Sequence, residues 1–148
     1  ILTNHAVNKG RITVFGGTQM RPNIHMQDIV GLYLKLLECP VEKIAGQVFN
    51  AAYDNYSVSD TAEIVRTAVS REMPGKQNIE VVTTPSDDIR SYHISSEKIR
   101  RVLGFQPKLG IADGVRDLVA AFRAGKLPDA MTDPKYYNIR MMKNIHLK

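Results

Sequence analysis

Residues 11–28, RITVFGGTQMRPNIHMQD, constrain the fold of this chain more than any other stretch. The β-branched side chains of Ile12 and Val14 are typical of a short strand. Gly16 and Gly17 end that strand, because glycine accepts a positive φ without steric cost. We therefore expect a strand that breaks at a sharp glycine turn and leads into a different element.

An arginine and a proline follow the glycine turn. Pro22 biases the preceding Arg21 away from helical dihedral angles, so its guanidinium should project from extended backbone, where it can meet an anion. Residues 23–26 alternate polar and apolar side chains and predict a second short extended run. Asp28 then stands at the expected N-cap of a helix, since apolar side chains recur at helical spacing from residue 29 to residue 37.

Local patterns predict the remaining elements in the same way. The expected elements are the last turns of a helix at 1–7 closed by Gly10, a helix at 29–38, a strand at 47–52, a turn at 53–55, a helix capped by Ser57 with Asp60, a strand at 79–83, a short helix capped by Ser95, and a helix at 111–124. Helices alternate with short strands, which predicts an α/β fold. Three or four strands are few for a complete doubly wound sheet.

The composition fits one globular domain. The 148 residues are 43% hydrophobic and 24% charged, and no apolar run reaches the roughly 20 residues that a bilayer span needs. The single cysteine, Cys39, excludes an internal disulfide and favours a reducing cytoplasm. The first residue is not methionine, so we expect the chain to be a fragment of a longer protein.

The net charge of +5 favours anionic partners in general. Its basic residues are scattered, without the aromatic interleaving of a single-strand binder, so we expect no nucleic-acid partner. Much of the excess lies in residues 127–148, which we expect to form an extended basic tail. The four histidines are too dispersed for a metal site, and we expect no metal.

Four segments occur in an order and at a spacing that resemble a known family. They are MRPNIHMQDIV (20–30), QVFNAA (47–52), DDIRSYHISSEKI (87–99) and LGFQP (103–107). Together they resemble the later segments of extended short-chain dehydrogenases/reductases, the NAD-dependent epimerases and dehydratases that act on nucleotide-diphosphate sugars. The resemblance covers nearly the whole chain but only the second half of a full-length member.

The resemblance implies a fold and an activity. Residues 1–148 would be the C-terminal, substrate-binding portion: the last sheet strands of a Rossmann-like domain, around Val14 and Val48-Phe49, plus a small substrate-binding lobe. Part of the core would then be an interface for a missing half. The full enzyme would hold NAD or NADP, oxidise a sugar carbon transiently with a tyrosine as base, return the hydride, and form a homodimer.

The resemblance also implies substrate-binding residues, each of which has a simpler interpretation. Arg21 and Arg90 would clamp the diphosphate, and Tyr92 would lie near the nucleotide. Arg21 could instead form a surface ion pair with a carboxylate such as Asp28, and Arg90 a local pair with the aspartates before it. Asn50 would lie close to the nucleotide or its ribose, but an asparagine that closes a strand is also ordinary turn chemistry.

Two motifs that the family uses to bind the dinucleotide and to catalyse the reaction are absent from the sequence. No G-x-G-x-x-G turn follows a strand, and none of the six tyrosines has a lysine four residues later, so the Tyr-x-x-x-Lys pair is missing. His25 has no assignable nucleophile or base beside it and is expected to be structural. We therefore expect no catalytic residue here, and the fragment should be inactive alone. The alternative is a non-catalytic module that binds nucleotides or a partner.

Overall fold

The computed structural model describes residues 1–88 and 90–146. Its helices are α1 (Leu2–Lys9), α2 (Met26–Glu38), α3 (Val41–Ile44), α4 (Val58–Glu72), α5 (Glu97–Leu103), α6 (Ile111–Arg123), the 3-10 helix η1 (Pro134–Tyr136) and α7 (Asn138–Asn144). Its strands are β1 (Arg11–Phe15), β2 (Met20–Asn23), β3 (Asp54–Ser57) and β4 (Glu80–Thr84). The predicted α/β class is confirmed.

The strands form two separate pairs. β1 and β4 run parallel, in register from Arg11 opposite Glu80 to Phe15 opposite Thr84. β2 and β3 run antiparallel, with Arg21 opposite Tyr56. Parallel strands need a long crossover, and here the crossover contains β2, α2, α3, β3 and α4.

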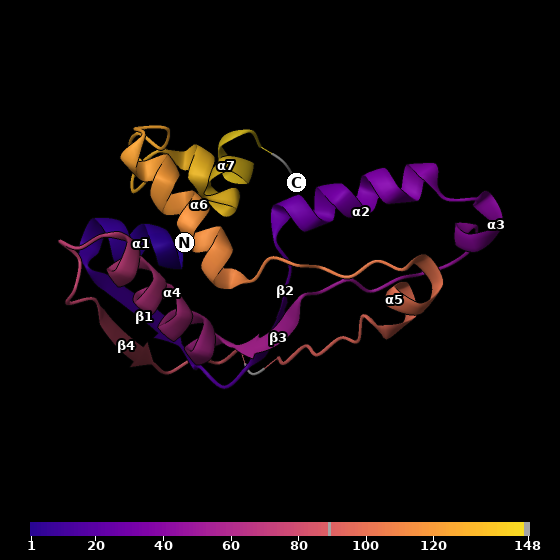
Figure 1. The fold of residues 1–148 in the computed structure, drawn as a ribbon. Helices are drawn as coiled ribbons and strands as arrows, with labels where there is room; N and C mark the ends of the chain where they lie inside the picture. The colour runs from indigo at the N-terminus through magenta and orange to yellow at the C-terminus, as the bar shows by residue number, and fades with distance from the viewer. Residues whose placement is uncertain (89, 147–148) are drawn as a thin grey trace.

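The buried side chains divide the molecule into two lobes. The closed lobe comprises α1, β1, α4, β4 and α6, whose core includes Ala6, Ile12, Val14, Val69 and Val119. The open lobe comprises α2, α3, residues 47–51 and α5, and its smaller cluster is built on Leu32, Ile99, Leu103 and Phe105. Figure 1 shows the two lobes on either side of the β2–β3 pair.

The chain visits the lobes alternately. It begins in the closed lobe with α1 and β1, enters the open lobe with α2 and α3, and returns through β3 to α4 and β4. It then enters the open lobe again for α5 and ends in the closed lobe with α6 (Figure 1). Neither lobe is therefore one continuous piece of sequence.

Two cap predictions are confirmed. Gly10 takes the left-handed conformation after α1, with φ 65°. Ser57 caps α4, because its hydroxyl accepts from the Asp60 N–H at 3.0 Å. Gly16 and Gly17 both have positive φ, as the glycine turn requires.

Two other predictions of helix caps are wrong by a few residues. The N-cap of α2 is His25, whose side chain accepts from the Gln27 N–H, and Asp28 lies inside the first turn. The Asp28 carboxylate instead accepts from the N–H groups of Lys108 and Leu109 at 3.0 and 2.9 Å. It thereby joins α2 to the loop before α6, a long-range contact that the local pattern does not contain.

The N-cap of α5 is Ser96, one residue after the predicted Ser95.

The predicted strand at 47–52 is wrong. Those residues form no strand, and the next strand, β3, lies at Asp54–Ser57, where a turn was predicted. Asp54–Ser57 pairs with β2, whereas Val48 is 79% exposed and has no paired strand in the described chain. A strand requires a partner as well as β-branched and aromatic residues. Val14 does lie in the parallel sheet as predicted, but Val48-Phe49 does not.

The predicted extended tail at 127–148 is also wrong over much of its described length. It contains turns, η1 and α7, and Asp133 caps η1 by accepting from the Lys135 N–H. The tail begins in contact with α1, because the Asn4 side chain donates to the Ala130 carbonyl at 2.7 Å. Residues 147–148 of the tail, and Ile89 of the segment 87–99, lie outside the described residues. No helix among the described residues is long and apolar enough to cross a bilayer.

Candidate functional site

Arg21 is held in a fixed position on β2. Pro22 keeps its backbone extended, and the strand pairing places it opposite Tyr56. Its Nη1 atom donates to the carbonyl oxygens of Met20 at 2.9 Å and Arg90 at 2.5 Å. The guanidinium is therefore oriented by the backbone, and about one third of the side chain remains exposed.

The segment after β4 lies along β2 and brings distant residues to Arg21. The Tyr92 N–H donates to the Met20 carbonyl, and the Met20 N–H donates to the Ser91 hydroxyl. The side chain of Gln19, which is 8% exposed, donates to the carbonyls of Phe15 and Asp88. These bonds fix the loop against the strand, so the residues around position 90 face Arg21.

Asp88 lies between the two arginines. Its carboxylate accepts from Arg90 Nε at 2.7 Å and from Arg90 Nη2 at 2.9 Å, and lies 3.7 Å from Arg21 Nη2. The guanidinium of Arg21 also lies 5.2 Å from the centre of the Tyr92 ring, a cation–π contact. We call Arg21, Asp88, Arg90 and Tyr92 the arginine cluster.

Asp88 and Arg90 shift each other's pKa. The hydrogen bond from Arg90 lowers the pKa of Asp88 from 3.8 to about 2. The same hydrogen bond raises the pKa of Arg90 above its ordinary value. Asp88 is therefore ionised throughout the neutral range, and the cluster combines two cations with one anion. Its chemistry suits an anionic ligand that can accept from both guanidinium groups.

The structure brings together three of the four predicted site residues. Arg21, Arg90 and Tyr92 meet in the cluster. Asn50 is exposed, and none of the hydrogen bonds in the described part of the chain involves it. The simpler interpretation of Arg21 named the wrong carboxylate: its ion-pair partner is Asp88, since Asp28 bonds elsewhere.

Sequence reasoning missed three residues that build the cluster. Asp88 was read only as a local partner of Arg90, and Gln19 carried no signal. Asn55 was assigned to a turn, but its side chain donates to the Ile94 carbonyl and accepts from the Ile94 N–H at 2.9 and 3.0 Å. It thereby anchors the segment that carries Tyr92.

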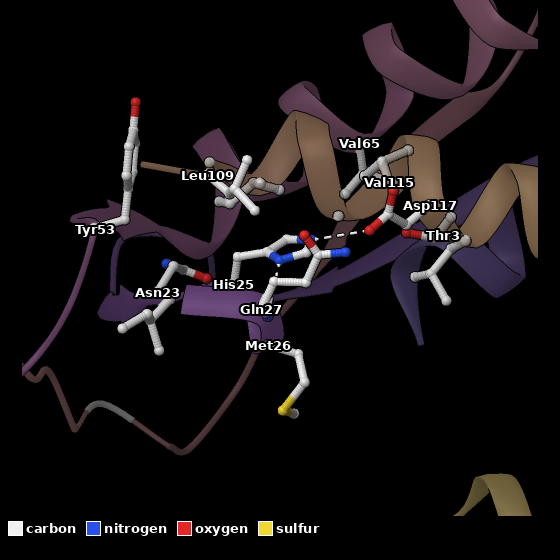
Figure 2. Close-up of a pocket in the computed structure, with 15 residues that line it drawn as sticks. Thr3, Asn23, His25, Met26, Gln27, Tyr53, Val65, Leu109, Val115 and Asp117 are labelled. Atoms are coloured by element: carbon white, nitrogen blue, oxygen red, sulfur yellow. Dashed lines mark hydrogen bonds and ion pairs between the residues drawn. The ribbon is translucent and has the colours of Figure 1, made fainter. Parts of the chain in front are cut away.

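A cavity of about 620 Å³ lies at the end of β2, between α6 and the start of α2 (Figure 2). His25 lies in its wall and is almost buried. Its Nδ1 accepts from the Gln27 N–H at 3.2 Å, and its Nε2 lies 3.3 Å from the Asp117 carboxylate. Because both ring nitrogens are engaged, His25 is a structural link between α2 and α6. The described residues that line the cavity include no other histidine.

The surroundings of this cavity are mainly apolar side chains, among them Val65, Leu109 and Val115 (Figure 2). Gly114 on α6 permits the close approach of the His25 ring, since a Cβ there would lie 3.3 Å from His25 Cδ2. The described residues that line the cavity include no lysine or arginine that could bind a phosphate. The arginine cluster is therefore the better candidate for binding an anion.

Comparison with known proteins gives a fold. No protein-family model matches the chain, and no curated protein sequence does. Solved structures do match. L-threonine dehydrogenase from Phytophthora infestans is 15% identical, with 84% of this chain matching 40% of that chain at a TM-score of 0.67.

Two further solved structures match over part of their length. ADP-L-glycero-D-manno-heptose-6-epimerase from Helicobacter pylori is 16% identical, with 83% of this chain matching 36% of that chain at a TM-score of 0.65. An NAD-dependent NDP-hexosamine 5,6-dehydratase involved in tunicamycin biosynthesis is 20% identical, with 83% matching 39% at a TM-score of 0.64. The chain thus spans about two fifths of the length of its structural neighbours. It therefore has the Rossmann-like α/β fold of part of these neighbours, in agreement with the fold that the resemblance implies.

Proposed function

We propose that this chain is the substrate-binding portion of an NAD- or NADP-dependent nucleotide-sugar epimerase or dehydratase. The arginine cluster carries this proposal, because it places two guanidinium groups together on a fold shared with enzymes of that class. In our proposal Arg21 and Arg90 bind the diphosphate of a nucleotide-diphosphate sugar. Tyr92, beside Arg21, lies near the nucleotide.

The two arginines differ in a way that suits this role. Arg21 is fixed by two carbonyl oxygens, so part of the ordering entropy is lost before the ligand arrives. Arg90 is 71% exposed and can turn toward a ligand. A charge-assisted hydrogen bond contributes roughly 1.5–3 kcal/mol, which corresponds to about a tenfold or greater change in affinity.

The dinucleotide would be bound mainly by an upstream half. The glycine turn after β1 does not fit a pyrophosphate, because its amides are already used: Gly16 donates to the Thr84 carbonyl and Gly17 to Gln19 Oε1. The sequence also lacks the Tyr-x-x-x-Lys pair. The hydride chemistry would therefore belong to residues outside this chain, and the chain alone would be inactive.

The open lobe offers a surface for that upstream half. An exposed apolar stripe runs along α2 and into α3 with helical spacing; it comprises Met26, Val30, Tyr33, Leu34, Leu37 and Val41. A groove of about 510 Å³ lies beside it, between α2 and the unpaired residues 47–51. A further strand could pair with residues 47–51 and place apolar side chains under α2. This arrangement would complete both the sheet and the helix layer.

The same surface supports a second candidate function. The chain could be a non-catalytic module that binds a nucleotide or a partner protein and retains the fold without the chemistry. We prefer the enzyme, because the arginine cluster suits the diphosphate of a nucleotide sugar. As part of that enzyme the chain would act in the cytoplasm, where the single thiol of Cys39 stays reduced, and would belong to a homodimer.

Calorimetric titration with UDP, GDP, ADP and dTDP, each against its monophosphate, tests the proposal. We expect at least one diphosphate to bind more tightly than its monophosphate, and Arg21→Gln to weaken that binding about tenfold. Arg66→Gln is the matched control, because among the described residues Arg66 pairs with Glu63 alone, on the surface of α4. Equal binding of each diphosphate and its monophosphate, or equal effects of the two substitutions, would contradict the proposal.

A further inference from the structure

Asp88 occupies the space beside both guanidinium groups of the arginine cluster. Its two carboxylate oxygens accept from Arg90 in a paired geometry, at 2.7 and 2.9 Å, and one of them lies 3.7 Å from Arg21. A phosphate group accepts from arginine with the same paired geometry. The carboxylate therefore already makes the contacts that a phosphate would need.

We infer that Asp88 is the internal counter-ion of the phosphate site: its carboxylate holds the Arg90 guanidinium while the site is empty, and a diphosphate replaces it. This inference rests on the proposed binding of a diphosphate by Arg21 and Arg90. It adds a residue that opposes binding, and it assigns the movement on binding to Arg90.

The contacts of the two arginines support the inference that Arg90 moves on binding and Arg21 does not. Arg21 donates to two backbone carbonyls and lies over the Tyr92 ring, so it can remain in place when a ligand arrives. Arg90 donates through Nε and Nη2 to the Asp88 carboxylate, and its guanidinium also interacts with the Tyr92 hydroxyl. Release of the Asp88 carboxylate removes these two hydrogen bonds and lets the exposed Arg90 side chain turn.

The loop does not depend on the negative charge of Asp88. Its backbone is held by Gln19, which donates to the Asp88 carbonyl at 3.0 Å, and by Ser86, whose hydroxyl accepts from the Asp88 N–H. An asparagine at position 88 could still accept from the Arg90 N–H, as one carboxylate oxygen does at 3.2 Å. Asp88→Asn should therefore remove the charge and keep the loop.

The expected size of the effect of Asp88 on anion binding follows from the exposure of its ion pair with Arg90. An ion pair between exposed groups contributes little, so the diphosphate can displace Asp88. The remaining carboxylate lies beside the bound anion and repels it through a solvent-rich medium. We expect Asp88→Asn to tighten anion binding by about three- to tenfold at low ionic strength.

The experiment is a titration of the whole chain with inorganic pyrophosphate, followed by calorimetry and by the ¹⁵Nε resonances of the arginines. The chain carries a matched control at the neighbouring position, because Asp87 is exposed and none of the ion pairs among the described residues includes it. We expect Asp88→Asn to tighten binding three- to tenfold and Asp87→Asn to change it less than twofold. The Arg90 resonance should move on binding much more than the Arg21 resonance.

Three outcomes would overturn the inference. Equal effects of the two asparagine substitutions would show only a change in net charge. Weaker binding by Asp88→Asn would mean that the carboxylate orients the arginines for the ligand. Binding that Arg21→Gln leaves unchanged would refute the phosphate site itself, and that result separates failure of the proposed function from failure of the role of Asp88.

Discussion

The closed and open lobes are built from the same kinds of residue but differ in how many of their faces are covered. In the closed lobe the apolar sides of α1, α4 and α6 meet over β1 and β4, and Ile12 and Val69 are fully buried. In the open lobe α2 buries only Leu32 among its residues, while Leu37 is 84% exposed. An apolar sequence pattern therefore marks a face that needs a partner, and that partner need not belong to the same chain.

The largest expected effect lies in the closed lobe. Ile12→Ala removes a fully buried side chain from the strand against which α1 and α4 pack. We expect it to lower the free energy of unfolding by about 2–5 kcal/mol, because it creates a cavity that its neighbours only partly fill. Urea denaturation monitored by circular dichroism measures this loss. A loss below 1 kcal/mol would mean that this core is loose as well.

A buried residue of the open lobe gives a smaller and more local effect. Ile99→Ala removes a side chain that is 1% exposed, but its cluster is small and lies under an exposed helix. We expect hydrogen exchange to quicken in α2 and α5 while β1 keeps its protection. Equal acceleration in β1 would show that the two lobes unfold as one unit and would remove the distinction between them.

Loss of the α4 cap should destabilise the closed lobe less than Ile12→Ala does. Ser57→Ala removes the hydroxyl that accepts from the Asp60 N–H and donates to its carboxylate at 2.6 Å. We expect a loss of about 1 kcal/mol in the free energy of unfolding. Ser57→Asn should recover much of that stability. Ser59→Ala serves as the comparison, because Ser59 lies two residues later in the first turn of α4 and does not cap the helix.

Substitution on the exposed stripe should barely change the stability of this chain. Leu37→Lys should alter the free energy of unfolding by less than about 0.5 kcal/mol, because the side chain is already in water. Leu32→Lys, on the buried side of the same helix, should unfold the open lobe. Thermal melts of the two variants test the contrast, and a large loss from Leu37→Lys would show that the stripe is covered.

The smallest expected effect on stability concerns Asp88. Its pKa is lowered in the folded chain, so its contribution to folding is complete above pH 3.8 and is lost as the pH falls toward about 2. Stability should therefore show no step from Asp88 between pH 5 and pH 8. Arg90→Gln should return this pKa toward its ordinary value, which ¹³C titration of the carboxyl group can detect. An unchanged pKa would mean that Arg90 does not hold the carboxylate.

The sequence predicted best the features that depend on near neighbours. The Ser57 cap, the Gly10 closure of α1 and the helix before Gly125 need only residues within a few positions. The strand predicted at 47–52 failed because β propensity says nothing about where a pairing strand lies. The residues of QVFNAA have strand character, but the strand pairing in this chain uses Asp54–Ser57.

The candidate site was predictable only in part for the same reason. Arg21 is recognisable beside Pro22, and the resemblance added Arg90 and Tyr92. Asp88 looked like a partner of Arg90 alone, because its approach to Arg21 depends on a loop that Gln19 and Asn55 hold in place. Those two amides act through tertiary contacts, which leave no local pattern in the sequence.

The alternating path of the chain between its lobes limits how a gene for such a protein can be rearranged. No single cut in the coding sequence separates the closed lobe from the open lobe, because α5 follows β4 and precedes α6. A recombination event between α2 and α5 would divide both lobes at once. The loop that carries Asp88 and Arg90 and the exposed helix α2 should therefore be inherited together, and exchange between relatives should succeed only when the whole region moves as one block.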